Sequence, residues 1–99
     1  MARNRNTTRD GYSFDTATIE AVWKKGTPES YEGFRKDACN ASMQRSKYGQ
    51  TVQYGWEIDH IKPVASGGSD DLNNLQPLQW ENNRAKSDEY PHKTCAIRS

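Results

Sequence analysis

The stretch WEIDHIKPVASGGSDDLNNLQPLQWENNRAKSD, Trp56 to Asp88, decides the fold. Its first part alternates two sets of side chains, Trp56, Ile58 and His60 on one face and Glu57, Asp59 and Ile61 on the other. The alternation predicts a strand that ends near Asp59 and His60, before Pro63 interrupts the pattern. The glycines and short polar residues of ASGGSDDLNN then predict a loop.

Two further elements are expected after this loop. LQPL, residues 75–78, predicts a short strand at the edge of a sheet, because Pro77 has no N–H to donate. QWENNRAKSD, residues 79–88, contains good helix formers and neither glycine nor proline, and Glu81 suits the first turn of a helix. The predicted order is strand, loop, strand, helix.

Four polar residues of this unit could share one site. Asp59 and His60 point to opposite faces of a regular strand, but a twist at the strand end can turn both toward the helix. Asn83 and Lys86 are three residues apart and so project from one helix face. A carboxylate and an amide carbonyl are hard oxygen ligands, which suit Mg²⁺ or Mn²⁺ better than zinc.

A histidine that acts as a base beside a metal held by oxygen ligands suits the hydrolysis of a phosphodiester. Neutral His60 could take the proton of a water, since an ordinary histidine pKa of ~6.5 leaves the ring mostly unprotonated at neutral pH. Such a base typically contributes ~10²- to 10⁴-fold in rate. A metal held by Asp59 and Asn83 would stabilise the charge on the leaving oxygen, and Arg84 and Lys86 would add positive charge around the phosphate.

Residues 54–88 strongly resemble the HNH endonucleases of the ββα-metal superfamily. The family motif runs Asp-His, a Gly-Gly loop, Asn-Leu, and a helix with Asn or His followed three residues later by Lys. The matching residues here are Asp59-His60, Gly67-Gly68, Asn74-Leu75, and Asn83 with Lys86. The resemblance covers about a third of the chain and is specific, because several residue types coincide at fixed spacings.

The resemblance implies a role for four of these residues. His60 would be the general base, Asp59 and Asn83 the metal ligands, and Asn74 the central asparagine that braces the loop and orients the histidine. A helix with asparagine at the last motif position makes this an H-N-N variant.

Each asparagine of the motif has a neighbour as an alternative. Asn82 competes with Asn83, and the three-residue step to Lys86 favours Asn83. Asn73 competes with Asn74, and the leucine that follows favours Asn74.

The H-N-N pattern bears on the metal. An amide oxygen has no competing protonation near neutral pH, so metal binding should depend on pH less than with an imidazole ligand. We therefore expect one divalent ion, Mg²⁺ or Mn²⁺ rather than Zn²⁺ or Ni²⁺. Many relatives carry two C-x-x-C pairs around a structural zinc, and this sequence has none, so packing must brace the motif.

The remainder of the 99 residues predicts one small α+β domain with an N-terminal helix packed as scaffold. That helix is DTATIEAVWKKG, residues 15–26, with Asp15 as its cap and Gly26 at its end. Residues 34–55 predict one or two short strands. We expect residues 13–99 to form an HNH nuclease domain with its ββα-metal motif at 54–88. The basic residues 1–12 should be a flexible arm.

The net charge of +1 does not by itself indicate a nucleic-acid partner. Double-stranded DNA is nevertheless the expected partner, contacted at its phosphates by Lys62, Arg84, Lys86, Arg3 and Arg5. For the arm, an ordinary solvated terminus is an equally good interpretation. No apolar run approaches the ~18 residues needed to span a bilayer. We expect a cytoplasmic monomer or weak homodimer with no membrane partner.

Cys39 and Cys95 form neither a C-x-x-C pair nor the four-ligand set of a structural zinc site. We expect both to be ordinary reduced thiols. A metal site of Cys39, His92 and Cys95 is conceivable, but no ligand spacing supports it.

The sequence thus predicts a metal-dependent DNA endonuclease that nicks one strand per event with low sequence specificity. A DNA-binding module without turnover is an alternative, although binding alone needs neither a base nor hard-metal ligands. RNA cleavage is a further alternative that the motif residues do not distinguish.

Overall fold

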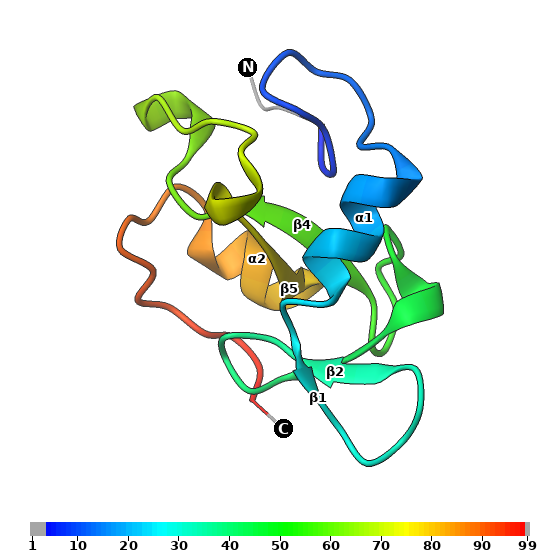
Figure 1. Ribbon diagram of the computed structural model, residues 1–99. Coiled ribbons are helices and arrows are strands. Elements are labelled where there is room, and N and C mark those ends of the chain that lie inside the picture. Colours follow the sequence, from blue (N-terminus) through cyan, green and yellow to red (C-terminus); the bar gives the residue numbers. More distant parts are fainter. Residues whose placement is uncertain (1–3, 99) are drawn as a thin grey trace.

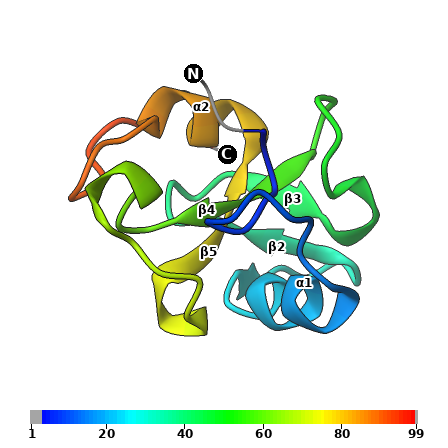
Figure 2. The same cartoon turned by 90° about the horizontal axis from the view of Figure 1, so that it is seen from above.

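A two-stranded β-hairpin lies between two helices in the computed structural model, which describes residues 4–98 (Figures 1 and 2). A second, three-stranded sheet lies beside this unit. The helices and strands, in chain order, are α1 (Thr16–Trp23), β1 (Thr27–Pro28), β2 (Phe34–Lys36), β3 (Ser42–Gln44), β4 (Trp56–His60), β5 (Leu75–Gln79) and α2 (Trp80–Lys86). The α+β class and the helical scaffold agree with the sequence prediction.

The second half of the chain forms the predicted strand, loop, strand and helix. β4 and β5 pair antiparallel, from Trp56 opposite Gln79 to His60 opposite Leu75. α2 begins directly after β5, because the Gln79 side chain accepts the N–H groups of Glu81 and Asn82 and so caps the helix. This cap aligns α2 against β4.

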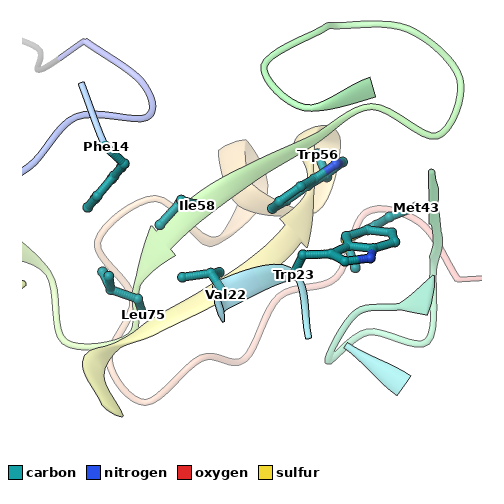
Figure 3. Close-up of a cluster of buried hydrophobic side chains, with 7 residues drawn as sticks. All are labelled: Phe14, Val22, Trp23, Met43, Trp56, Ile58 and Leu75. Atoms are coloured by element: carbon teal, nitrogen blue, oxygen red, sulfur yellow. The ribbon is translucent and has the colours of Figure 1, made fainter. Parts of the chain in front are cut away.

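The faces of β4 meet two different environments. Trp56 and Ile58 are buried in the apolar cluster, where Trp23 of α1 lies with its ring centroid 5.1 Å from that of Trp56 (Figure 3). Phe14, Val22, Met43 and Leu75 complete the buried cluster. The alternate residues, Glu57 and Asp59, point the other way, toward α2. The period-two pattern therefore separates the core from a polar layer.

The predicted scaffold helix is confirmed over Thr16–Trp23. Asp15 caps it by accepting the N–H of Thr18 at 2.8 Å. Hydrogen bonding to the Thr18 side chain, and secondly to the Thr18 N–H, holds the pKa of the Asp15 carboxyl below its ordinary value. Beyond the helix, the Lys25 ammonium donates to the carbonyls of Leu72 and Leu75. α1 is thereby attached to the loop that leads into β5.

The N-terminal segment has a defined position along β4, although its composition predicted a mobile arm. The Asn6 side chain accepts the N–H of Ile58 at 2.7 Å, and the N–H of Arg9 donates to the Asp70 carboxylate at 3.0 Å. Asn6 thus satisfies a donor on the strand edge that β5 does not pair. Arg3 lies outside the described residues.

The expectation of two reduced thiols is wrong for this structure. Cys39 and Cys95 form a disulfide, with their Cα atoms 5.8 Å apart and a sequence separation of 56. The tail folds back beside the turn that carries Cys39, a long-range contact that cysteine spacing alone does not reveal. No helix among residues 4–98 is long and apolar enough to cross a membrane.

Candidate functional site

The three principal residues of the sequence hypothesis line one cleft. Asp59 and His60 reach it from the end of β4 and Asn83 from α2, and the cleft has a volume of about 300 Å³. Its other walls are the segments 4–7, 63–65 and 87–88. The N-terminal segment and the loop after β4 therefore enclose the same space as the motif residues.

Asp59 is a buried carboxylate with two partners. Its Oδ2 accepts from Gln76 at 2.9 Å, and its Oδ1 lies 3.3 Å from the Lys86 ammonium. Burial raises the pKa of the Asp59 carboxyl above its ordinary value, while the Gln76 hydrogen bond and the Lys86 charge act to lower it. Each oxygen has a second lone pair, so both contacts leave acceptor capacity for a cation.

Asn83 is oriented by Glu57, a residue that the sequence analysis gave no role. The Asn83 side-chain nitrogen donates to Glu57 Oε1 at 2.9 Å, and both residues are buried. Because the nitrogen is used in this way, the amide oxygen is the atom left to act as a ligand. Glu57 lies two residues before Asp59 on the same strand face, which is the signal that could have identified it.

Lys86 supports Asp59 from below the cleft surface. Its side chain is 0% exposed, and its ammonium also donates to the backbone oxygen of His60 at 3.2 Å. In this position Lys86 joins the two consecutive site residues of β4. It does not present its charge to solvent, so a direct phosphate contact by Lys86 has no support from the geometry.

His60 has a carboxylate partner, Asp70, that the sequence analysis also missed. His60 Nε2 lies 2.8 Å from Asp70 Oδ1 and donates to it, and the imidazole packs 6.0 Å from the Phe14 ring. Partial burial acts to raise the pKa of Asp70, but the hydrogen bonds from His60 and from the Arg9 N–H outweigh it, so this pKa lies below its ordinary value. Asp70 lies in a loop, where no periodicity could have indicated the contact.

Asn74 braces the loop between His60 and the second half of the motif. Its side-chain oxygen accepts the N–H of Lys62 at 2.8 Å, and its nitrogen donates to the carbonyls of Lys62 and Ser69. Its backbone oxygen accepts the N–H of Ile61. These contacts fix the chain immediately after His60.

The predicted phosphate contacts differ in exposure. Lys62 is exposed, and Arg5 lies at the wall of the cleft. Arg84 is 43% exposed, lies over the Trp80 ring at 5.2 Å and donates to Glu57 at 3.3 Å. These three side chains are exposed to solvent, whereas that of Lys86 is buried.

The donor set fits a hard divalent ion. Asp59 supplies a carboxylate whose charge is only partly compensated inside the protein, and Asn83 supplies an amide oxygen held in place by Glu57. Oxygen donors of this kind, with the remaining positions filled by water, match the coordination of Mg²⁺ or Mn²⁺.

A ββα unit here brings a histidine, a carboxylate and a side-chain amide into one cleft, a set of groups that suits metal-dependent hydrolysis. The family model for HNH endonuclease matches residues 39–89, just over half of the chain, and the protein belongs to this family. Membership implies nuclease activity on a nucleic acid. No curated protein and no solved structure matched the chain.

Proposed function

We propose that the protein is a DNA endonuclease in which His60 activates water and Asp59 and Asn83 hold one Mg²⁺ or Mn²⁺ ion. The observation that supports this best is the shared cleft, where the base and both ligands come from β4 and α2. A site that only bound DNA would need neither a base nor a buried carboxylate directed at a cation.

His60 is the proton acceptor. Because Nε2 donates to Asp70, Nδ1 is the nitrogen that takes the proton of the attacking water. Asp70 holds the ring in this tautomer and stabilises the imidazolium that results. The water oxygen then bonds to phosphorus as the bond to the leaving oxygen breaks. The leaving oxygen takes up a proton from solvent water, which gives a 5′-phosphate and a 3′-hydroxyl.

The ligands and cations hold the phosphate. Asp59 and Asn83 would hold a divalent ion, which would supply positive charge to stabilise the charge that develops during phosphodiester hydrolysis. Arg5, Lys62 and Arg84 are the exposed cations proposed to contact the backbone, together with Arg3. Lys86 acts indirectly, by holding Asp59 in place.

One site cleaves one strand at a time. A monomer should therefore nick, and cleavage of both strands needs a second encounter or a weak homodimer. Contacts to phosphate do not distinguish one base from another, so we expect low sequence specificity.

The test is a supercoiled-plasmid assay with the wild type, His60→Ala and Asn83→Ala, in EDTA, Mg²⁺, Mn²⁺ and Zn²⁺. Asn73→Ala is the matched control, because Asn73 is exposed and lies outside the cleft. We expect relaxed circles only with Mg²⁺ or Mn²⁺, loss of activity of at least ~10²-fold for His60→Ala, and normal activity for the control.

Each other outcome has a distinct meaning. Plasmid that stays intact with every metal but is retarded on a gel would mean that the protein is a DNA-binding module without nuclease activity. Cleavage of an RNA oligonucleotide in preference to DNA, lost in the same variants, would keep the mechanism and change the substrate. Cleavage that survives His60→Ala would contradict the assigned base.

A further inference from the structure

We propose that Cys39, His92 and Cys95 form a second metal site, for a thiophilic ion such as Zn²⁺, when the disulfide is reduced. The three ligand atoms lie within 4.8 Å of one another. Among residues 4–98, no other group of three histidine, cysteine or acidic side chains meets that spacing. The cluster shares no residue with the cleft of Asp59 and Asn83. It is therefore a separate site with different chemistry.

The donor set selects a different class of metal from the first site. Two thiolates and an imidazole are soft and borderline ligands, which favour Zn²⁺ over Mg²⁺ or Mn²⁺. From typical bond lengths, a tetrahedral zinc ion places a sulfur and a nitrogen ligand about 3.6 Å apart. Cys39 Sγ and His92 Nε2 are 3.9 Å apart, close to that separation. Three protein ligands leave a fourth position for water.

Two of the ligands are accessible while the third is buried. Cys39 is fully buried, and His92 and Cys95 are partly exposed. A metal ion can thus enter from the side of the C-terminal tail. His92 Nε2 donates to the Thr94 carbonyl at 2.6 Å in the disulfide form, and metal binding by this nitrogen would replace that hydrogen bond.

Hydrogen bonds that do not depend on the disulfide hold Cys39 in place. The Asp37 carboxylate accepts the N–H groups of Cys39 and Ala41 through one oxygen, each at 2.9 Å. Its other oxygen accepts from the Gln79 N–H and from the Asn82 side chain. The turn that carries Cys39 is thus fixed to the start of α2.

The same helix holds the tail beside Cys95. The Asn82 side chain donates to the Ile97 carbonyl at 2.9 Å and accepts the Ile97 N–H at 2.7 Å. Asn82 therefore connects Asp37 to a tail residue only two positions from Cys95. Because Asn82 is bonded both to Asp37, which holds Cys39, and to Ile97, near Cys95, reduction should leave the two sulfurs close together instead of releasing the tail.

The disulfide and the metal are alternative links between the same two residues. A thiol reductant opens the disulfide to two Cys thiols and is itself oxidised to a disulfide, and binding of Zn²⁺ then releases the two thiol protons. Hydrogen peroxide reverses the change: the two thiolates lose two electrons to form the disulfide, two protons and the peroxide give two waters, and Zn²⁺ leaves. In a reducing compartment the metal form would secure the tail.

Cobalt titration of the reduced full-length protein tests this site independently of nuclease activity. Co²⁺ bound to thiolates gives a sulfur-to-metal charge-transfer band and the intense visible bands of a tetrahedral ion, whereas an oxygen-ligand site gives neither. We expect both signals at one Co²⁺ per chain, displaced by Zn²⁺. Cys95→Ser should remove the charge-transfer pattern of a two-thiolate site, and His92→Ala should weaken binding by more than ~10-fold. His60→Ala, the matched histidine control, should retain the wild-type spectrum.

A second measurement covers the possibility that reduction unfolds the protein. Circular dichroism of the reduced, metal-depleted chain is recorded before and after addition of Zn²⁺. A folded chain that binds Co²⁺ through thiolates, or an unfolded chain that Zn²⁺ refolds, supports the proposal. A reduced chain that gives no charge-transfer band, whether folded or unfolded, and that Zn²⁺ does not refold would overturn it. Peroxide should release one Zn²⁺ per chain from the wild type, measured with a colorimetric chelator.

Discussion

Replacing Lys86 by methionine distinguishes a lysine that supports Asp59 from one that contacts phosphate. Methionine fills a similar volume but removes the ammonium that lies 3.3 Å from Asp59 Oδ1 and 3.2 Å from the His60 carbonyl. The Asp59 carboxylate, 6% exposed, would then lose a cation that compensates its burial. The variant therefore tests the polar layer between β4 and α2 directly.

The expected loss of stability is large. Removing one partner of a buried ion pair costs about 3–5 kcal/mol, because the remaining charge stays buried and uncompensated. Asp59 can reduce this cost by taking up a proton, so the lower end of the range is the better expectation. In a chain of this length a loss of about 3 kcal/mol lowers Tm by roughly 12–24 °C.

The effect should depend on pH with a definite sign. Burial raises the folded-state pKa of Asp59 above its ordinary value of 3.8, and loss of Lys86 would raise it further. The folded state then binds the proton more tightly than the unfolded chain, so stability falls as pH rises from the unfolded to the folded pKa. The deficit of Lys86→Met should be small in acid and reach its full size above the folded pKa.

Urea unfolding followed by tryptophan fluorescence at acidic and neutral pH measures this deficit. Lys62→Met is the control, because Lys62 is exposed, and it should keep the wild-type midpoint. A phosphate contact predicts the opposite pattern: Lys86→Met would be as stable as the wild type, and the salt dependence of DNA binding would lose about one unit of slope. Stability within about 1 kcal/mol of the wild type at neutral pH would refute the buried-support interpretation.

Three further predictions concern groups around the motif. Asp70→Asn should lower kcat for plasmid nicking by about 10-fold or more, since it weakens the support of the base. It should also flatten the acid side of the plot of stability against pH. The lowered folded-state pKa of Asp70 stabilises the wild type above pH 3.8, and this stabilisation is lost as the pH falls through that folded-state pKa. The double variant Cys39→Ser and Cys95→Ser should have a free energy of unfolding about 4 kcal/mol below that of the wild type under oxidising, metal-free conditions. The reason is that the disulfide, with a sequence separation of 56, closes a loop of 57 residues in the unfolded chain. Denaturant midpoints measure this difference. Asn74→Ala should destabilise the fold by about 1–3 kcal/mol by leaving the loop groups that it bonds without partners, while Asn73→Ala should be neutral in the same thermal melts.

Local patterns allowed much of the motif to be predicted. β4 was recognised because its alternation has the strand period, and α1 because Asp15 precedes its apolar face as a cap. Asp59, His60 and Asn83 could be grouped because a strand end and a following helix leave few other arrangements for them. The spacing along these elements is nearly sufficient to place the three side chains in one cleft.

Contacts between distant loops were not predictable in the same way. The Arg9 N–H and the Asp70 carboxylate are separated by 61 residues, and Cys39 and Cys95 by 56. Such pairs depend on how the loops close, and neither segment has a periodic pattern that reports the closure. The arm shows the limit most clearly, since its composition is that of a mobile segment. Its position depends on the Asn6 side chain, which accepts the N–H of Ile58, a donor of β4 that pairing with β5 does not use.

The short helix α2 links the two halves of the molecule, and this has a consequence for the proposed metal sites. Asn82 binds Asp37 and the tail, and the next residue, Asn83, is the proposed ligand in the nuclease cleft. A seven-residue helix has little intrinsic stability, so contacts on its two sides must hold it together. Asn82→Ala, which removes the contacts of α2 to Asp37 and to the tail, should therefore lower the affinity of the cleft for Mg²⁺, because Asn83 would be less firmly oriented. Reduction of the wild type should leave that affinity unchanged, because the Asn82 contacts to Ile97 do not depend on the disulfide.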